Sequence, residues 1–153
     1  MNETIVEIIK GMLAPGIMIS ACGLLLLGMN NKYSLVVNRI RTLNIEFRTL
    51  EQGNVERRDC ILLQLPLLIE RMKTIRNAVW LYTFGIAMFI FSIFSIGLHL
   101  SNMKTSVYTV VTINLFVFAL IAVLLGVVYA AKEVLLGYKI LKIETANLHY
   151  IDD

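Results

Sequence analysis

The sequence is poor in charged residues, which excludes an ordinary soluble domain. Only 16% of its 153 residues are charged, against about one quarter in a typical soluble protein. No charged residue occurs in 78–98 or 107–131, and 13–29 is a third uncharged run, which the apolar residues of 33–37 extend. The first two runs exceed the roughly 20 residues that cross a bilayer's hydrocarbon core. Because so small a soluble domain cannot bury three such runs, the sequence predicts an all-α membrane protein with three long transmembrane helices.

Histidine is also scarce, and the carboxylates avoid the predicted spans. His99 and His149 are predicted on opposite sides of the membrane, without cysteine or carboxylate neighbours at metal-ligand spacing. No span contains a carboxylate, which disfavours a proton-relay pump. Neither a glycine-rich phosphate loop nor a serine placed with a histidine and an acid is present. The chain is therefore predicted not to be an enzyme and to need no metal or cofactor.

Two cysteines are too few and too far apart for a disulfide scaffold. Cys22 falls inside a span and Cys60 in a polar segment, so both are interpreted as packing residues. The residues before the first span include Glu3 and Glu7 and lack a basic cluster. A cleaved signal peptide is therefore not expected.

The basic residues predict the orientation. Of 14 lysines and arginines, nine lie in 32–76 and three in 132–142, whereas only Lys10 and Lys104 fall on the other side. The positive-inside rule places the N-terminus outside and the C-terminus in the cytoplasm. Acidic residues alternate with the basic ones, which indicates a solvated helix surface and no nucleic-acid partner.

The polar block between the first two spans is predicted to be a coiled-coil-like helical hairpin that reverses at Gln52-Gly53-Asn54. Apolar residues alternate at spacings of four and three in both arms, the pattern of helices packed side by side. The same rhythm continues into each adjoining span, so each arm and its span are expected to form one nearly unbroken helix. On the first helix the series is Pro15, Ile19, Cys22, Leu26, Met29, Tyr33, Val36, Ile40, Leu43, Phe47 and Leu50, and on the second it is Ile61, Leu65, Leu68, Met72, Ile75, Val79, Tyr82, Ile86, Phe89, Ile93 and Ile96.

The chain is predicted to be one domain whose segments follow in order. Residues 1–12 form an outer interfacial helix, 13–33 the first span, 34–77 the cytoplasmic hairpin, 78–98 the second span and 107–131 the third. A short outer loop joins the last two spans. Residues 132–153 continue as a cytoplasmic tail helix, in which Val134, Tyr138, Leu141 and Leu148 recur at helical spacing. Pro66 is expected to bend the second arm.

Three stretches carry a resemblance to a known family. They are residues 14–33, which open on Ala14-Pro15 and contain Asn31-Lys32 just before their last residue, residues 38–43 (NRIRTL), and residues 70–82 (ERMKTIRNAVWLY). The chain resembles the small bacterial membrane proteins of domain-of-unknown-function family 2721. Family members often have arginine after the asparagine where this sequence has Lys32. The resemblance implies the three-span topology and a bacterial cytoplasmic membrane, but no established activity.

A second stripe lies one residue along from the apolar series of the first helix. Its residues are small and polar within the predicted first span, and basic in the cytoplasmic segment that follows. Two interpretations apply: close helix packing through small residues, or the wall of a water-filled path, because polar faces in lipid must turn inward or toward water. The stripe comprises Gly16, Ser20, Gly23, Leu27, Asn30, Ser34, Val37, Arg41, Asn44 and Arg48.

One chain with three spans is too thin to enclose a pore, so the path would require a cyclic homo-oligomer of roughly four to six subunits. Its partners would be further copies of the chain and membrane lipid. The lining candidates are Gly16, Ser20, Gly23, Leu27, Asn30 and Asn31, with Leu27 as a hydrophobic constriction. Arg41 and Arg48 would line a cytoplasmic vestibule that favours anions. Asn114 is a further intramembrane polar residue, expected to bond a neighbouring helix.

Two other functions remain open. The hairpin is suited to a non-conducting scaffold or signalling protein, since alternating charge sets partner choice. The chain also fits a subunit of a larger membrane complex, because no self-contained site is visible.

Overall fold

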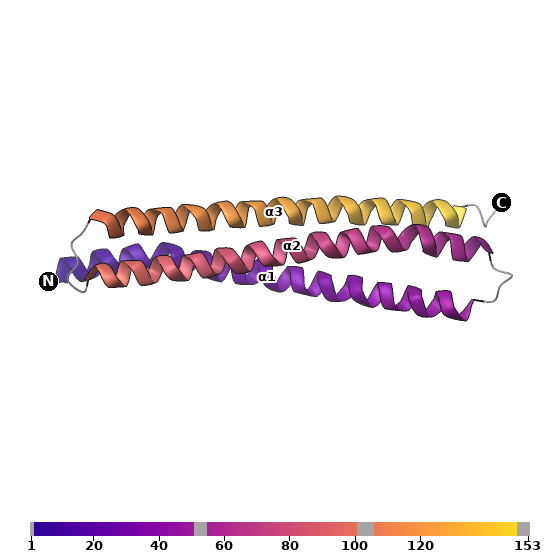
Figure 1. The fold of residues 1–153 in the computed structure, drawn as a ribbon, viewed down its shortest axis with the longest axis horizontal. Coiled ribbons are helices and arrows are strands. Elements are labelled where there is room, and N and C mark those ends of the chain that lie inside the picture. The colour runs from indigo at the N-terminus through magenta and orange to yellow at the C-terminus, as the bar shows by residue number, and fades with distance from the viewer. Residues whose placement is uncertain (1, 51–54, 101–105, 150–153) are drawn as a thin grey trace. The chain divides into compact units, whose positions relative to one another are not determined.

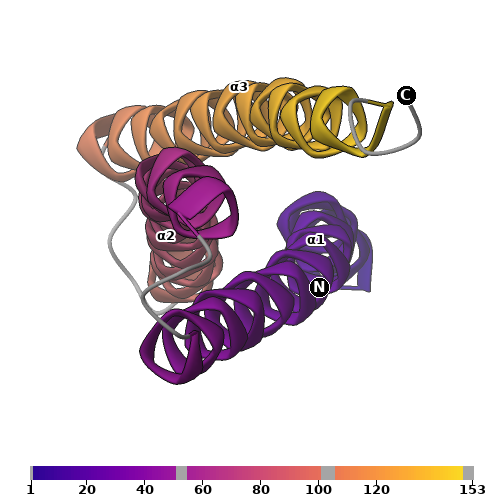
Figure 2. The same cartoon turned by 90° about the vertical axis from the view of Figure 1, so that its right-hand side faces the viewer.

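The computed structural model describes residues 2–50, 55–100 and 106–149, which form three long helices (Figure 1). They are α1 (Asn2–Thr49), α2 (Val55–Leu100) and α3 (Ser106–His149), shown again in the turned view of Figure 2. Each helix contains an apolar segment that is long enough to cross a membrane. The predicted all-α class and the three candidate spans are therefore confirmed. The predicted reversal at 52–54 lies outside the described residues.

The helices contribute to two compact units. Unit 1 comprises Met1–Gly28 and Val79–Val127, and unit 2 comprises Met29–Ala78 and Val128–Asp153. Most of the predicted span residues belong to unit 1, and the polar block and the tail belong to unit 2. All three helices take part in both units.

α1 is continuous, as its apolar rhythm predicted. It contains 48 residues, or about 72 Å at 1.5 Å per residue. Pro15 lies inside it, so no break separates the predicted interfacial segment 1–12 from the first span. Pro66 likewise lies inside α2. The N–H of Leu50 donates to the carbonyl of Glu46 at 3.0 Å and completes the last turn of α1.

The buried members of the predicted series on α1 and α2 recur at every seventh position, and α2 buries further residues beside them. The other members of both series are half-buried, except for Tyr33, which is exposed. A seven-residue spacing places side chains on one face of a helix, so the pattern identifies the packed face. The buried members are Pro15, Cys22, Met29, Val36 and Leu43 on α1, and Ile61, Leu68, Ile75, Tyr82 and Phe89 on α2.

Unit 1 packs small residues of α3 against aromatic residues of α2. Cys22, Phe89 and Ala119 form its buried core, and the rings of Phe89 and Phe116 meet edge to face with centroids 5.5 Å apart. Gly126 of α3 packs directly against the ring of Tyr82, since an added Cβ would lie 2.7 Å from its Cε1. Small residues at helix contacts are the usual packing device in membranes.

The buried face of α3 in the tail does not follow the apolar residues that recur there at helical spacing. Val134, Tyr138 and Leu141 are exposed, whereas Glu133, Leu136 and Ile140 are buried. Apolar spacing alone therefore does not mark the packed face of this segment. On α3 the packed positions Ala119, Gly126, Glu133 and Ile140 recur every seven residues, and a carboxylate occupies one of them.

Candidate functional site

The most distinctive polar feature is a buried carboxylate in unit 2. The side chain of Glu133 on α3 is fully buried. Nζ of Lys32 on α1 donates to its Oε2 at 2.8 Å, and Nε of Arg71 on α2 donates to its Oε1 at 2.7 Å. Nη2 of Arg71 also lies 2.6 Å from Oε1. One carboxylate thus joins all three helices, and we call these three residues the charge cluster.

Helical register explains how the three residues meet. Glu133 lies on the packed face of α3, seven residues after Gly126. Arg71 lies between the buried Leu68 and Ile75 on α2. Gly137, one turn after Glu133, faces the arginine, and an added Cβ would be in ordinary contact at 3.4 Å from Cζ of Arg71. The guanidinium therefore lies close against the backbone of α3.

The cluster carries a net charge of +1, because one carboxylate faces two cations. Two cationic partners compensate the cost of burying the carboxylate, which would be several kcal/mol if it were unpaired. The lysine and arginine side chains keep 41% and 27% of their surface exposed. Each therefore contacts both the buried carboxylate and the exterior.

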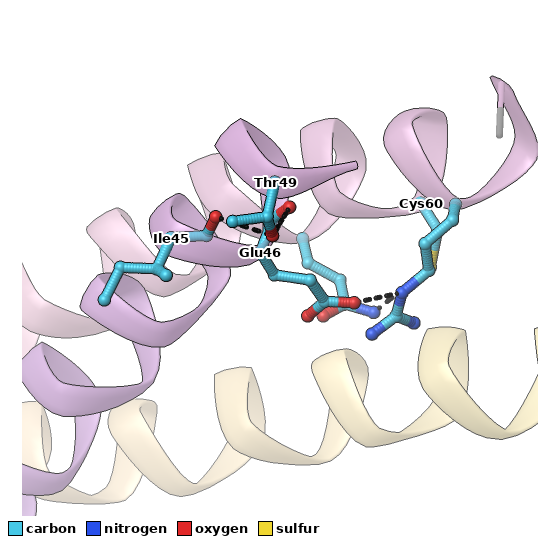
Figure 3. A network of polar contacts seen from close by, with 6 residues as sticks. Ile45, Glu46, Thr49 and Cys60 are labelled. Carbon is cyan, nitrogen blue, oxygen red and sulfur yellow. Dashed lines mark hydrogen bonds and ion pairs between the residues drawn. The ribbon is translucent and has the colours of Figure 1, made fainter. Parts of the chain in front are cut away.

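Unit 2 contains a second, more exposed network near the end of α1. Nε of Arg57 donates to Oε1 of Glu46 at 2.7 Å, and the hydroxyl of Thr49 contacts the carbonyls of Ile45 and Glu46 (Figure 3). The hydrogen bond from Arg57 lowers the pKa of Glu46 below its ordinary value, with further help from the charges of Arg57 and Arg39 and against a smaller effect of burial. This network joins the end of α1 to the beginning of α2.

Two further contacts support the same region. The guanidinium of Arg58 lies 4.9 Å from the ring centroid of Phe47, within range of a cation–π interaction. Nε2 of Gln64 donates to Sγ of Cys60 at 3.3 Å, and both residues are buried.

The predicted lining residues lie on an outward face of α1. Ser20, Gly23, Leu27, Asn30 and Asn31 are exposed, and Gly16 is half-buried. A Cβ added at Gly16 or Gly23 would meet nothing within 4 Å. Within residues 2–50, 55–100 and 106–149 this face stays largely open, so its role as a pore lining stays a prediction.

Several polar groups of the predicted site bond to their own helix. The hydroxyl of Ser20 donates to the carbonyl of Gly16 at 3.3 Å, and Nδ2 of Asn114 donates to the carbonyl of Val110 at 2.8 Å. Within this chain Asn114 therefore bonds to α3 itself rather than to a neighbouring helix. Arg41 and Arg48 of the predicted vestibule are exposed on α1.

Across the part of the chain that the structure describes, no group of three or more His, Cys, Asp or Glu residues is arranged to hold a metal ion. Cys22 and Cys60 are buried free thiols.

The sequence reasoning missed the charge cluster, although a signal for Glu133 exists. It is the only carboxylate between Glu70 and Glu144, and it lies at sevenfold spacing from Ala119 and Gly126. A polar residue in register with a packed face indicates a buried partner. The identity of the two partners needed the three-dimensional structure, because they lie 101 and 62 residues away.

Comparison with known proteins gives one match. A model of the family described as "Protein of unknown function (DUF2721)" matches residues 12–143, which confirms the resemblance seen in the sequence. No curated protein and no solved structure matches the chain. The charge cluster and the whole stripe of α1 lie inside the matched residues.

Proposed function

The chain belongs to the DUF2721 family, and from this starting point we propose that its copies assemble into a ring whose first helices enclose a path for small ions. The ring contains roughly four to six subunits, enough α1 helices to surround an axis. The N-terminus lies outside and unit 2 lies in the cytoplasm. The proposal assigns no catalytic step and no nucleic-acid partner to the chain.

The outward face of α1 is the observation that carries the proposal. In the first span this face combines Gly23 with Ser20, Asn30 and Asn31, all exposed on the single chain. Polar groups facing hydrocarbon are costly, so such a face is expected to meet other protein or water. A ring that turns α1 inward provides both.

The same face supplies a gate and a charged mouth. Leu27 is 59% exposed. It would form a hydrophobic constriction that is closed when water leaves it and open when water fills it. Asn30 and Asn31 follow it at the inner end. Arg41 and Arg48 would line the vestibule and raise the local anion concentration, which gives the path a preference for anions.

A membrane-anchored scaffold is the second candidate, favoured by the internal hydrogen bonds of the stripe. Since Ser20 bonds to the carbonyl of Gly16, the small face can also pack against another helix without water. In that case the hairpin of unit 2 would dock a partner protein through its mixed charges, or the chain would act as a subunit of a larger membrane complex.

The first experiment is native mass spectrometry of the detergent-solubilised chain, followed by ion flux into liposomes. A closed oligomer with flux that Leu27→Ser increases is the expected result. Cys60→Ala serves as a control, because that residue is buried in unit 2 and should leave flux unchanged. His149→Ala, in the tail, is a second control. A monomer or dimer, or flux no higher than in empty liposomes under every gradient and pH, would leave the scaffold as the better proposal.

A further inference from the structure

The charges of unit 2 are unevenly distributed along its helices. The ten-residue stretches 32–41, 68–77 and 132–141 together contain eight lysines and arginines and two glutamates, a net charge of +6. Residues 42–67 contain three arginines and four acidic residues. We call the three stretches the basic collar. It lies where the predicted spans end, and the acidic residues lie farther along the hairpin.

Both carboxylates of the basic collar already have cationic partners. Glu133 binds Lys32 and Arg71, and Glu70 lies 3.8 Å from Lys132. The net positive charge is therefore directed outward, since Arg41, Lys73, Arg76 and Lys139 are also exposed. Such a surface is complementary to anions.

The charge cluster is the ordered part of this surface. Glu133 holds the ammonium of Lys32 and the guanidinium of Arg71 on the two oxygens of one carboxylate. A lysine offers three donors and an arginine five, so both residues keep donors for a second acceptor. Because the carboxylate already holds the two cations beside each other, these side chains lose less conformational entropy when a phosphate binds.

Apolar side chains surround the same turns. Leu35, Val134 and Leu135 are 69%, 58% and 67% exposed, and they lie within three residues of Lys32 or Glu133 along the chain. A free anion would leave these side chains in water. A phospholipid places its phosphate on the cations and its acyl chains over the apolar residues.

We propose that the charge cluster, within the basic collar, binds the headgroup phosphate of an anionic phospholipid. Lys32 and Arg71 contact the phosphate, and Glu133 acts as the positioning residue that keeps them together. Basic pockets between helices at the membrane surface are known to bind anionic lipid headgroups. The inference does not depend on whether the chain conducts ions.

The test is lipid titration of the purified full-length chain, followed by native mass spectrometry. Phosphatidylglycerol and phosphatidylcholine with the same acyl chains are compared. We expect phosphatidylglycerol to bind about 25-fold more tightly, as two cations near the headgroup would produce at about fivefold each. Equal affinity for the two lipids would overturn the proposal.

A pair of variants with the same change of charge locates the site. The triple variant Lys32→Gln, Arg71→Gln and Glu133→Gln lowers the net charge by one, and Arg48→Gln near the end of α1 lowers it by the same amount. The triple variant should lose most of the preference and Arg48→Gln should keep it. The opposite result, or an equal loss in both, would mean that general charge and not the cluster attracts the lipid.

Further measurements keep the test decisive. If circular dichroism shows that the triple variant is unfolded, the charge-neutral pair Lys32→Gln with Glu133→Gln replaces it, and Lys32→Arg is its conservative control. The pair should bind phosphatidylglycerol about fivefold more weakly, and Lys32→Arg should bind it as the natural chain does. Equal affinity in the pair and the natural chain would reject the cluster as the site.

Millimolar inorganic phosphate should leave lipid binding intact. If it abolishes the preference for phosphatidylglycerol, the cluster is a site for free phosphate and the lipid proposal fails.

Discussion

Gly126 of α3 lies directly against the ring of Tyr82 on α2. A Cβ built on the glycine would be 2.7 Å from Cε1 and 3.0 Å from Cδ1 of the tyrosine, whose side chain is fully buried. Because the ring is fully buried, this contact limits how closely α2 and α3 approach in unit 1. A side chain at position 126 must displace the ring.

Gly126→Ala is therefore expected to destabilise the chain by about 1–3 kcal/mol, the usual cost of overpacking. Gly28→Ala is its control, because an added Cβ there meets nothing within 4 Å. The control should be neutral or slightly stabilising, since alanine is the better helix former. Thermal unfolding in detergent, followed by circular dichroism, measures both variants. Equal melting temperatures for the two would show that the helices separate more easily than the contact implies.

Glu133→Gln is expected to destabilise unit 2. The substitution leaves Lys32 and Arg71 without their shared counter-charge, which costs 3–5 kcal/mol where both partners are fully buried. Because these two cations are partly exposed, water compensates some of the loss and we expect roughly 2 kcal/mol.

The matched control for Glu133 is Glu70→Gln. Glu70 also pairs with a lysine, but at 3.8 Å and with both side chains about half exposed. Exposed pairs of this kind contribute about 0–1 kcal/mol. Thermal unfolding of the two variants should differ clearly, and a loss for Glu70→Gln as large as that for Glu133→Gln would contradict the special role of the buried carboxylate.

Ser20→Cys tests whether the outward face of α1 meets water. In the ring proposal a charged thiosulfonate reagent added to liposomes should modify this cysteine and reduce flux. Ala21→Cys is the control, as residue 21 is also exposed but points about 100° around the helix. The natural Cys22 and Cys60 are buried, so the natural chain should react slowly. Equal modification at 20 and 21 would argue against a path that only the stripe lines.

Glu46 should titrate below the ordinary glutamate range, because Arg57 donates a hydrogen bond to its carboxylate. A depressed pKa means that the pair adds stability above the pKa of the unfolded chain and loses it as the pH falls through the pKa of the folded chain. The effect is expected to be small, since both side chains are partly exposed. Carboxyl-carbon NMR measures the pKa directly. Arg57→Gln should raise it toward the ordinary value, and an unchanged pKa would remove the pair as the cause.

Much of the fold was predictable because apolar side chains mark the packed faces of α1 and α2. Cys22, Val36 and Leu43 were identified from spacing alone, and each is buried. The face of the α3 tail was not predicted, since its register passes through Glu133, and a search for apolar spacing selects Val134 and Tyr138 instead. The stripe around Ser20 is a different case. Its geometry on one chain agrees with its sequence pattern, but its purpose depends on molecules that the single chain does not contain.

The sequence separations inside the charge cluster have a consequence for the order of folding. Lys32 and Arg71 are synthesised 101 and 62 residues before Glu133. Until α3 is present, α1 and α2 carry two cations whose shared carboxylate is absent. The last helix therefore brings the counter-charge as well as the packing surface. A chain that ends before Glu133 keeps both basic residues uncompensated. Pairing of Lys32 and Arg71 with Glu133 is therefore possible only after α3 has packed against α1 and α2.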